Sequence, residues 1–142
     1  MIQAERKYLI FNMSEKLFAF DLAQVAEVSE PQRTWPVPAV PHYYRGAMNF
    51  HGSIVAVMDL SAFMGFPAPD HAPEKQIVLH NGIASLAFIV ERVLRIVSEQ
   101  QVVFGEKPEG SFVAAQLILS EGMATLLDAD AIASQAAKQI NQ

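Results

Sequence analysis

The sequence predicts an all-β protein with small helices, built as two small barrels packed together. About ten short runs rich in β-branched and aromatic residues alternate with turn signals, which is the pattern of short strands. Both halves of the chain repeat a coarse plan: a hairpin, a further strand, and a final strand pair that closes on a helix. Two packed barrels explain this plan better than one sandwich, and 142 residues suit a single domain.

Composition excludes several classes of function. The formal charge of -5, with scattered basic residues, disfavours nucleic acid as a partner. There is no cysteine, so disulfides and thiolate metal sites are excluded. No signal-peptide core and no apolar run near the ~20 residues of a membrane helix is present, so we expect a cytoplasmic protein without direct membrane insertion. The 51% apolar content indicates either a large β core or a surface for other proteins.

The first strands follow from the N-terminal apolar runs. Tyr8–Met13 and Leu17–Leu22 predict a hairpin, because a polar break of turn length separates them. Asp21 is placed to cap a short helical turn, and Val25–Val28 then resumes an extended pattern.

A proline-rich strap comes next, over residues 30–41. Four of the eight prolines lie in it and favour an extended, polyproline-like backbone on the surface. Trp35 either pins this strap to the core with its ring, which we favour, or serves as an exposed binding anchor. His42–Arg45 is expected to form one helical turn.

The stretch R-G-A-M-N-F-H-G-S-I-V-A-V-M-D-L, residues 45–60, organises the rest of the chain. It predicts a strand, a tight turn at His51 and Gly52, and a second strand, because glycine allows the backbone conformations that turns and bulges need. A short helix is expected over Ser61–Gly65, with Ser61 as its N-cap. The proline-rich loop that follows is expected to be a mobile connector, with the chain passing between the two barrels near residues 66–75.

The second half contains five further strand signals and a helix. Gln76–His80 is expected to pair with Ile83–Glu91 across a two-residue turn at Asn81 and Gly82, and Val93–Ser98 forms another strand. A last pair, Phe112–Leu119 and Met123–Leu127, precedes a helix that begins at Asp128. The alanine-rich helix carries one narrow apolar stripe, which docks either on the barrel or on a partner helix; its members are Ile132, Ala136 and Ile140.

No constellation of catalytic or metal-binding residues is present. The four histidines lack metal-ligand spacing, and the chain has no G-x-S-x-G, P-loop or G-x-G-x-x-G motif. Asp59 is either a partly buried functional acid or, as we favour, a carboxylate that accepts backbone N–H bonds at the start of the next helix. We therefore expect a binding module, with no enzyme activity, no cofactor and no metal.

Several of these stretches, in this order, resemble the CheW-like domains of bacterial chemosensory arrays. The similarity runs from about Lys7 to Ile132 and is carried by Y-L-I-F…F-A-F-D-L, V-A-E-V, the proline-containing strap, the 45–60 stretch and the terminal M-A-T-L-L-D-A-D-A-I. The resemblance implies two packed five-stranded barrels and a non-enzymatic adaptor. It also implies two partners: the regulatory domain of a CheA-type histidine kinase, and the cytoplasmic tip of methyl-accepting chemoreceptors at membrane-associated arrays.

The resemblance also implies where the partners bind. The receptor tip lies in a groove between the barrels, and the residues that match the family's motifs should line or support it. These residues are Val25, Glu27, Gly46, Asn49, His51 and Gly52. The kinase contact is expected on an apolar patch of the second barrel within Gln76–Val97.

One position departs from the family pattern. The family usually has N-L-R-G where this chain has Asn-Phe-His-Gly, so His51 replaces an arginine whose charge is fixed. Either His51 simply occupies the turn, or the chain is a divergent member that serves pili, gliding or another output. A small-ligand-binding β-barrel is a further alternative.

Overall fold

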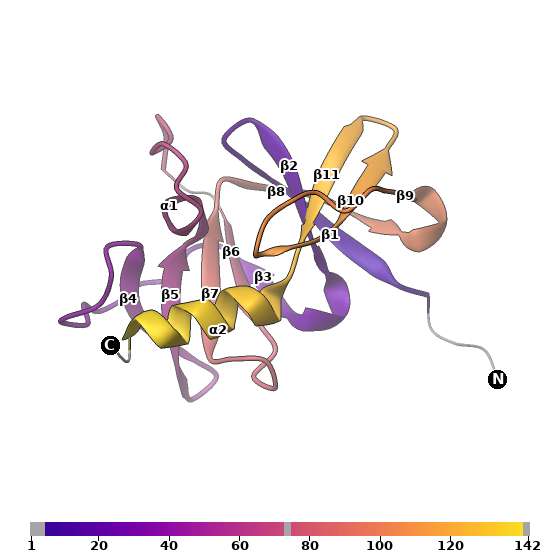
Figure 1. Cartoon of the computed structure of the whole chain (residues 1–142). Helices are drawn as coiled ribbons and strands as arrows, with labels where there is room; N and C mark the ends of the chain where they lie inside the picture. Colours follow the sequence, from indigo (N-terminus) through magenta and orange to yellow (C-terminus); the bar gives the residue numbers. More distant parts are fainter. Residues whose placement is uncertain (1–4, 73–74, 141–142) are drawn as a thin grey trace.

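Residues 5–72 and 75–140 are described by the computed structural model, and within them eleven strands form two sheets (Figure 1). The six-stranded sheet holds β1 (Lys7–Met13), β2 (Lys16–Asp21), β8 (Arg92–Ser98), β9 (Val103–Gly105), β10 (Val113–Leu119) and β11 (Gly122–Leu127). The five-stranded sheet holds β3 (Val25–Ser29), β4 (Tyr44–Phe50), β5 (Ser53–Asp59), β6 (Lys75–Leu79) and β7 (Leu86–Val90). The helical elements are η1 (Leu22–Gln24), α1 (Leu60–Phe63), η2 (Glu99–Gln101) and α2 (Ala129–Ile140). The predicted β-rich class is confirmed.

The two sheets share one pattern of strand pairing. In the six-stranded sheet the order is β8-β1-β2-β11-β10-β9, and in the five-stranded sheet, taken from its other end, it is β4-β5-β7-β6-β3. In each sheet an antiparallel hairpin is followed by a parallel neighbour, β11 beside β2 and β7 beside β5. The six-stranded sheet is therefore the same five-strand unit with β8 added at its edge.

The connector that we expected near residues 66–75 does not join the two units. It leads from α1 to β6, and β6 lies in the same sheet as β5, the strand before α1. The chain crosses between sheets at η1, after β2, and at Glu91, between β7 and β8. In the chain, the five-stranded unit is thus inserted into the six-stranded one. The strand signals, taken in chain order, did not indicate this insertion. Residues 73 and 74 of this loop lie outside the described residues.

Side-chain alternation produces three apolar cores. Alternate residues of a strand point to opposite faces of its sheet. On β1, Tyr8 and Ile10 point into the core of the six-stranded unit, whereas Leu9 and Phe11 point to a core that is shared with the other unit. β7 behaves in the same way, because Ala87 packs inside the five-stranded unit and its neighbours pack on the shared core. Strands buried on both faces account for much of the high apolar content.

The shared core joins the two units and also holds the C-terminal helix. The Phe20 ring from β2 stacks on the Phe88 ring from β7, with centroids 5.4 Å apart and planes at 13°. Ile132 and Ala136 are buried in this core, so the helix stripe docks on the protein itself, and α2 runs across the five-stranded unit in Figure 1. The side chain of Ile140, the third member of the stripe, lies outside the described residues. At the edge of this core, burial raises the pKa of Tyr44 to about 12.

Two of the predicted local structures are wrong because hydrogen bonds elsewhere decide them. His42–Arg45 is a turn that leads straight into β4: the Tyr44 N–H donates to the Pro41 carbonyl at 3.1 Å, and Tyr44 pairs with Met58. The two-residue turn at Asn81-Gly82 would need a positive φ at both residues, which neither has. Instead the Ile83 and Ala84 N–H groups both donate to the His80 carbonyl, and β7 begins only at Leu86.

The strap and the cap of α1 also differ from expectation. Trp35 is held by its backbone, since its N–H and carbonyl both bond to Ala47 at 2.9 Å, but its side chain is 45% exposed and does not enter the core. Asp59, rather than Ser61, caps α1: its carboxylate accepts the Ala62 N–H at 3.1 Å. The favoured role of Asp59 is confirmed, and its second oxygen accepts a bond from Arg45 at 2.8 Å.

Candidate partner-binding surface

The β4–β5 hairpin turn forms because three of its residues suit this backbone. His51 and Gly52 occupy its two central positions with φ values of 50° and 88°, as a type I′ turn requires. The Asn49 side-chain oxygen accepts the Gly52 N–H at 2.9 Å and closes the turn. The turn predicted from the sequence is therefore present, and its left-handed backbone carries the His51 side chain, which is 76% exposed.

His51 lies beside Glu27, although Glu27 is on the edge strand β3 and His51 follows β4, the edge strand at the other end of the sheet. The His51 Nε2 atom is 3.6 Å from the Glu27 Oε1 atom. β3 and β4 lie at opposite ends of the strand order, so the sheet must curl to bring β3 to the β4–β5 turn. In the six-stranded unit, Arg95 on the edge strand β8 forms a different contact, donating to Glu121 in the β10–β11 turn at 3.0 and 2.6 Å. The hydrogen bonds from Arg95 lower the pKa of the Glu121 carboxyl.

Val25 and Gly46 contact other parts of the protein, and these contacts help to hold the fold together. Val25 is half-buried and packs against the shared core. Gly46 is buried at a register shift in β4 with a φ of 137°, and a Cβ at this position would lie 2.2 Å from the Trp35 carbonyl oxygen. Of the six predicted residues, the structure therefore brings together Glu27, Asn49, His51 and Gly52 at one end of the five-stranded unit. Val25 and Gly46 are not part of this group: Val25 packs on the shared core, and Gly46 lies against the Trp35 backbone.

A hollow of about 400 Å³ opens beside this turn. We call it the histidine hollow, because His51 and His80 both line it. Its remaining lining comes from the strand ends and the 80–85 loop: Ala26, Phe50, Ser53, Val55, Val78, Leu79, Asn81, Ala84 and Ser85. Sequence reasoning missed this hollow, because His80 and the 80–85 loop come close to His51 only in the folded chain.

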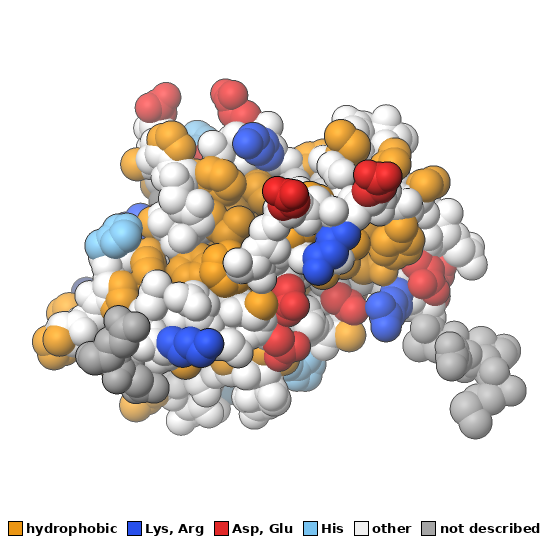
Figure 2. Space-filling model, in the orientation of Figure 1, with side chains coloured by type: hydrophobic (Ala, Val, Ile, Leu, Met, Phe, Trp, Pro, Cys, Tyr) orange, Lys and Arg blue, Asp and Glu red, His pale blue; other side chains and the backbone are white. Residues whose placement is uncertain are grey.

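Exposed apolar side chains mark two further surfaces. Leu94 and Ile96, on β8, are 43% and 50% exposed. They lie within Gln76–Val97, the range in which the kinase contact is expected. However, β8 belongs to the six-stranded unit and not to the unit that contains β6 and β7. Val103, Ile118 and Met123 occupy paired positions on β9, β10 and β11 and are also exposed. Figure 2 shows apolar side chains gathered over this part of the molecule.

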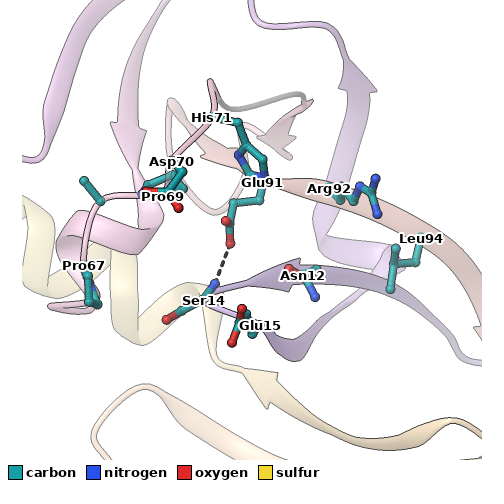
Figure 3. A pocket seen from close by; sticks show the side chains of 11 residues that line it. Asn12, Ser14, Glu15, Pro67, Pro69, Asp70, His71, Glu91, Arg92 and Leu94 are labelled. Carbon is teal, nitrogen blue, oxygen red and sulfur yellow. Dashed lines mark hydrogen bonds between the residues drawn. The ribbon is translucent and has the colours of Figure 1, made fainter.

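A second hollow, of about 440 Å³, lies at the seam between the two units (Figure 3). The β1–β2 turn forms one wall, the 67–71 loop another, and the crossing between β7 and β8 the third. In the figure the Glu91 carboxylate points to Ser14, whose backbone N–H donates to it. None of the six predicted residues lines this seam hollow, whose charged members are Glu15, Asp70, Glu91 and Arg92.

Within residues 5–72 and 75–140, no three His, Asp or Glu side chains are grouped closely enough to hold a metal ion. The same residues include no helix that is long and apolar enough to cross a membrane. The interior of each unit is filled by apolar side chains, which disfavours a ligand cavity inside either barrel.

Comparison with known proteins identifies the family. The family model of the CheW-like domain matches residues 7–137, which is most of the chain. The chain belongs to the CheW-like domain family. This agrees with the resemblance of the sequence and with the two matched five-strand units.

Curated relatives carry the CheW name. The CheW-like chain is 29% identical to a chemotaxis protein CheW of Thermotoga maritima over 115 residues, which cover 75% of this chain and 76% of that protein. It is 23% identical to a chemotaxis protein CheW of Bacillus subtilis, with 97% and 93% covered. A probable chemotaxis protein CheW of Rhizobium etli is 26% identical, with 94% and 90% covered.

A solved structure has the same fold. The scaffolding protein TtCheW from Thermoanaerobacter tengcongensis superimposes with a TM-score of 0.75 at 21% identity, covering 87% of this CheW-like chain and 89% of the other. At this identity the likeness shows the fold. The family match and the fold of this solved structure therefore agree.

Proposed function

We propose that this CheW-like protein is a non-enzymatic adaptor that couples chemoreceptors to a CheA-type histidine kinase. The match of the family model over residues 7–137 carries the proposal. In this proposal the protein works in the cytoplasm at receptor arrays. Its partners are the kinase regulatory domain and the cytoplasmic receptor tip.

The exposed turn supports a role in binding. Glu27 and His51 are 3.6 Å apart and both reach solvent, so a partner can contact them together. Asn49 and Gly52 fix the backbone that presents His51. We propose these four residues as the contact for one partner, with Val25 and Gly46 as supporting residues.

An apolar surface supports a second contact. Exposed aliphatic side chains that are close together are typical of protein interfaces. Leu94 and Ile96 are such a pair and fall in the chain range where the family resemblance implies the kinase contact. We propose that β8 contributes to that contact.

Co-sedimentation tests the adaptor role. Receptor-containing membranes and the CheA-type kinase of the same organism should retain the purified protein, and kinase retention should rise when it is present. Leu94→Glu should lower retention by the kinase roughly 10-fold, because it would place a charge in an apolar contact. Met123→Glu, on the other apolar surface, is the matched control. Absence of binding to any chemosensory kinase of the organism would remove the array role.

The arginine-to-histidine departure distinguishes the standard role from a divergent one. If the protein serves pili, gliding or another output, His51→Arg should increase coupling in a standard array, because arginine restores a fixed charge. If His51 only occupies the turn, the substitution should leave coupling unchanged. The measurement is receptor-controlled kinase activity with each variant.

A further inference from the structure

We propose that the histidine hollow binds an acidic side chain of a partner protein, and that binding strengthens as the pH falls. The proposal rests on the adaptor function only in taking the occupant to be a partner protein. It concerns a pocket formed by β3, the β4–β5 turn, the end of β6 and the 80–85 loop.

The charges around the hollow favour an anion. Among the described residues that line it, the only ionisable side chains are His51 and His80. The other described hollows include carboxylates in their walls, such as Glu91 in the seam hollow and Asp21, the last residue of β2, in another. In a protein of net charge -5, a wall of two histidines without a carboxylate is a local exception.

The rest of the lining fits a carboxylate on an apolar stem. Ser53, Asn81 and Ser85 bring hydroxyl and amide groups, which can donate hydrogen bonds to a carboxylate. Val55, Val78 and Leu79 provide the apolar floor on which methylene groups pack. At about 400 Å³, the hollow is large enough for one side chain and parts of its neighbours.

Glu27 is the charged group that opposes such an occupant. It approaches His51 from β3 at 3.6 Å, a separation longer than a direct hydrogen bond, so the contact is a loose one. The β3 residue that lines the hollow is Ala26, and Glu27 is not part of the lining. A partner carboxylate would therefore compete with Glu27 for His51 while His80 remains available to it.

The direction of the pH effect follows from the histidines. Histidine gains its positive charge as the pH falls through the range from about 8 to about 5. Both lining histidines are exposed, so a partner carboxylate can reach either imidazole ring. Attraction of a carboxylate should therefore increase over the same range, by roughly 2- to 5-fold for each exposed charge pair.

An NMR titration tests the proposal with defined probes. The blocked tripeptide N-acetyl-Leu-Glu-Leu-amide is added to the labelled full chain at about pH 5.5 and about pH 8, beside its Gln counterpart. We expect amide shifts around His51, His80 and Ser85 that are stronger at the lower pH and weaker with the Gln peptide. His51→Gln and His80→Gln should each weaken binding roughly 2- to 5-fold, whereas Glu27→Gln should strengthen it.

His71→Gln is the matched control, because His71 is exposed but lines the seam hollow instead. Spectral dispersion shows whether each variant is folded. Equal shifts with both peptides, unchanged binding in the double variant of His51 and His80, or no shift at either pH would each overturn the proposal. Kinase co-sedimentation is measured separately with the unmodified chain, so failure of the adaptor role is distinguishable.

Discussion

At Gly46 the backbone of β4 passes the proline-rich strap so closely that the absence of a side chain is essential. A Cβ on Gly46 would project towards two residues of the strap, Thr34 and Trp35. Its φ of 137° is also unfavourable for residues with a side chain. The sequence indicated a glycine with a backbone role, but the atoms that impose it come from a distant segment.

Gly46→Ala should lower the free energy of unfolding by about 2 to 4 kcal/mol, because backbone strain and a clash with a carbonyl add together. Urea denaturation measures the change. Gly52→Ala is the control, since it shares a positive φ of 88° but has no atom within 4 Å of the added Cβ. It should cost only about 1 kcal/mol, and equal losses would contradict the role of the strap.

His51 shows the limit of residue-by-residue inference. Its identity and its turn position could be predicted, because glycine and asparagine beside it favour a tight turn. Its neighbours could not be predicted. Glu27 and His80 reach it only because the five-stranded sheet curls, and curling depends on the whole sheet.

Among the structural elements, α1 depends on one carboxylate. Asp59 ends β5 and caps α1 with one oxygen, while the other oxygen accepts a bond from Arg45. The sequence offered two caps, Asp59 and Ser61. The position of the first helical residue decides between them, and that position is set by pairing of β5 with β7 up to Asp59.

Asp59→Ala should destabilise the protein by about 1 to 2 kcal/mol, because it removes the cap and the contact with Arg45. Thermal or urea unfolding gives the value. Asp59→Asn retains a capping oxygen and should cost less. Ser61→Ala should also cost less than Asp59→Ala; the reverse order would mean that Ser61 is the true cap.

For the molecule as a whole, the shared core makes two units into one body. Phe20 and Phe88 come from different sheets and stack at its centre, and α2 adds Ile132 and Ala136. Because both units bury one strand face in this core, neither can lose it without exposing apolar surface. We therefore expect the two units to unfold together.

Phe88→Ala should reduce the free energy of unfolding by about 3 to 5 kcal/mol, because it leaves a cavity in the shared core. Amide signals from both sheets, followed through a denaturant titration, should shift to the same lower midpoint. Val103→Ala, at a side chain that is 65% exposed, is the control and should change stability by less than about 0.5 kcal/mol. A shift confined to the five-stranded sheet would show that the units unfold independently.

The sequence by itself determined the strands, the His51 turn, the C-terminal helix and the family, because alternation, turn residues and motif order are local properties. Tertiary structure decided which strands share a sheet, where the chain crosses between units, and which residues surround His51. Those outcomes depend on contacts between distant segments, such as β11 beside β2 and Glu27 beside His51. Strand signals carry no information about such pairings, since a strand pattern fixes which side chains are buried but not which neighbouring strand buries them.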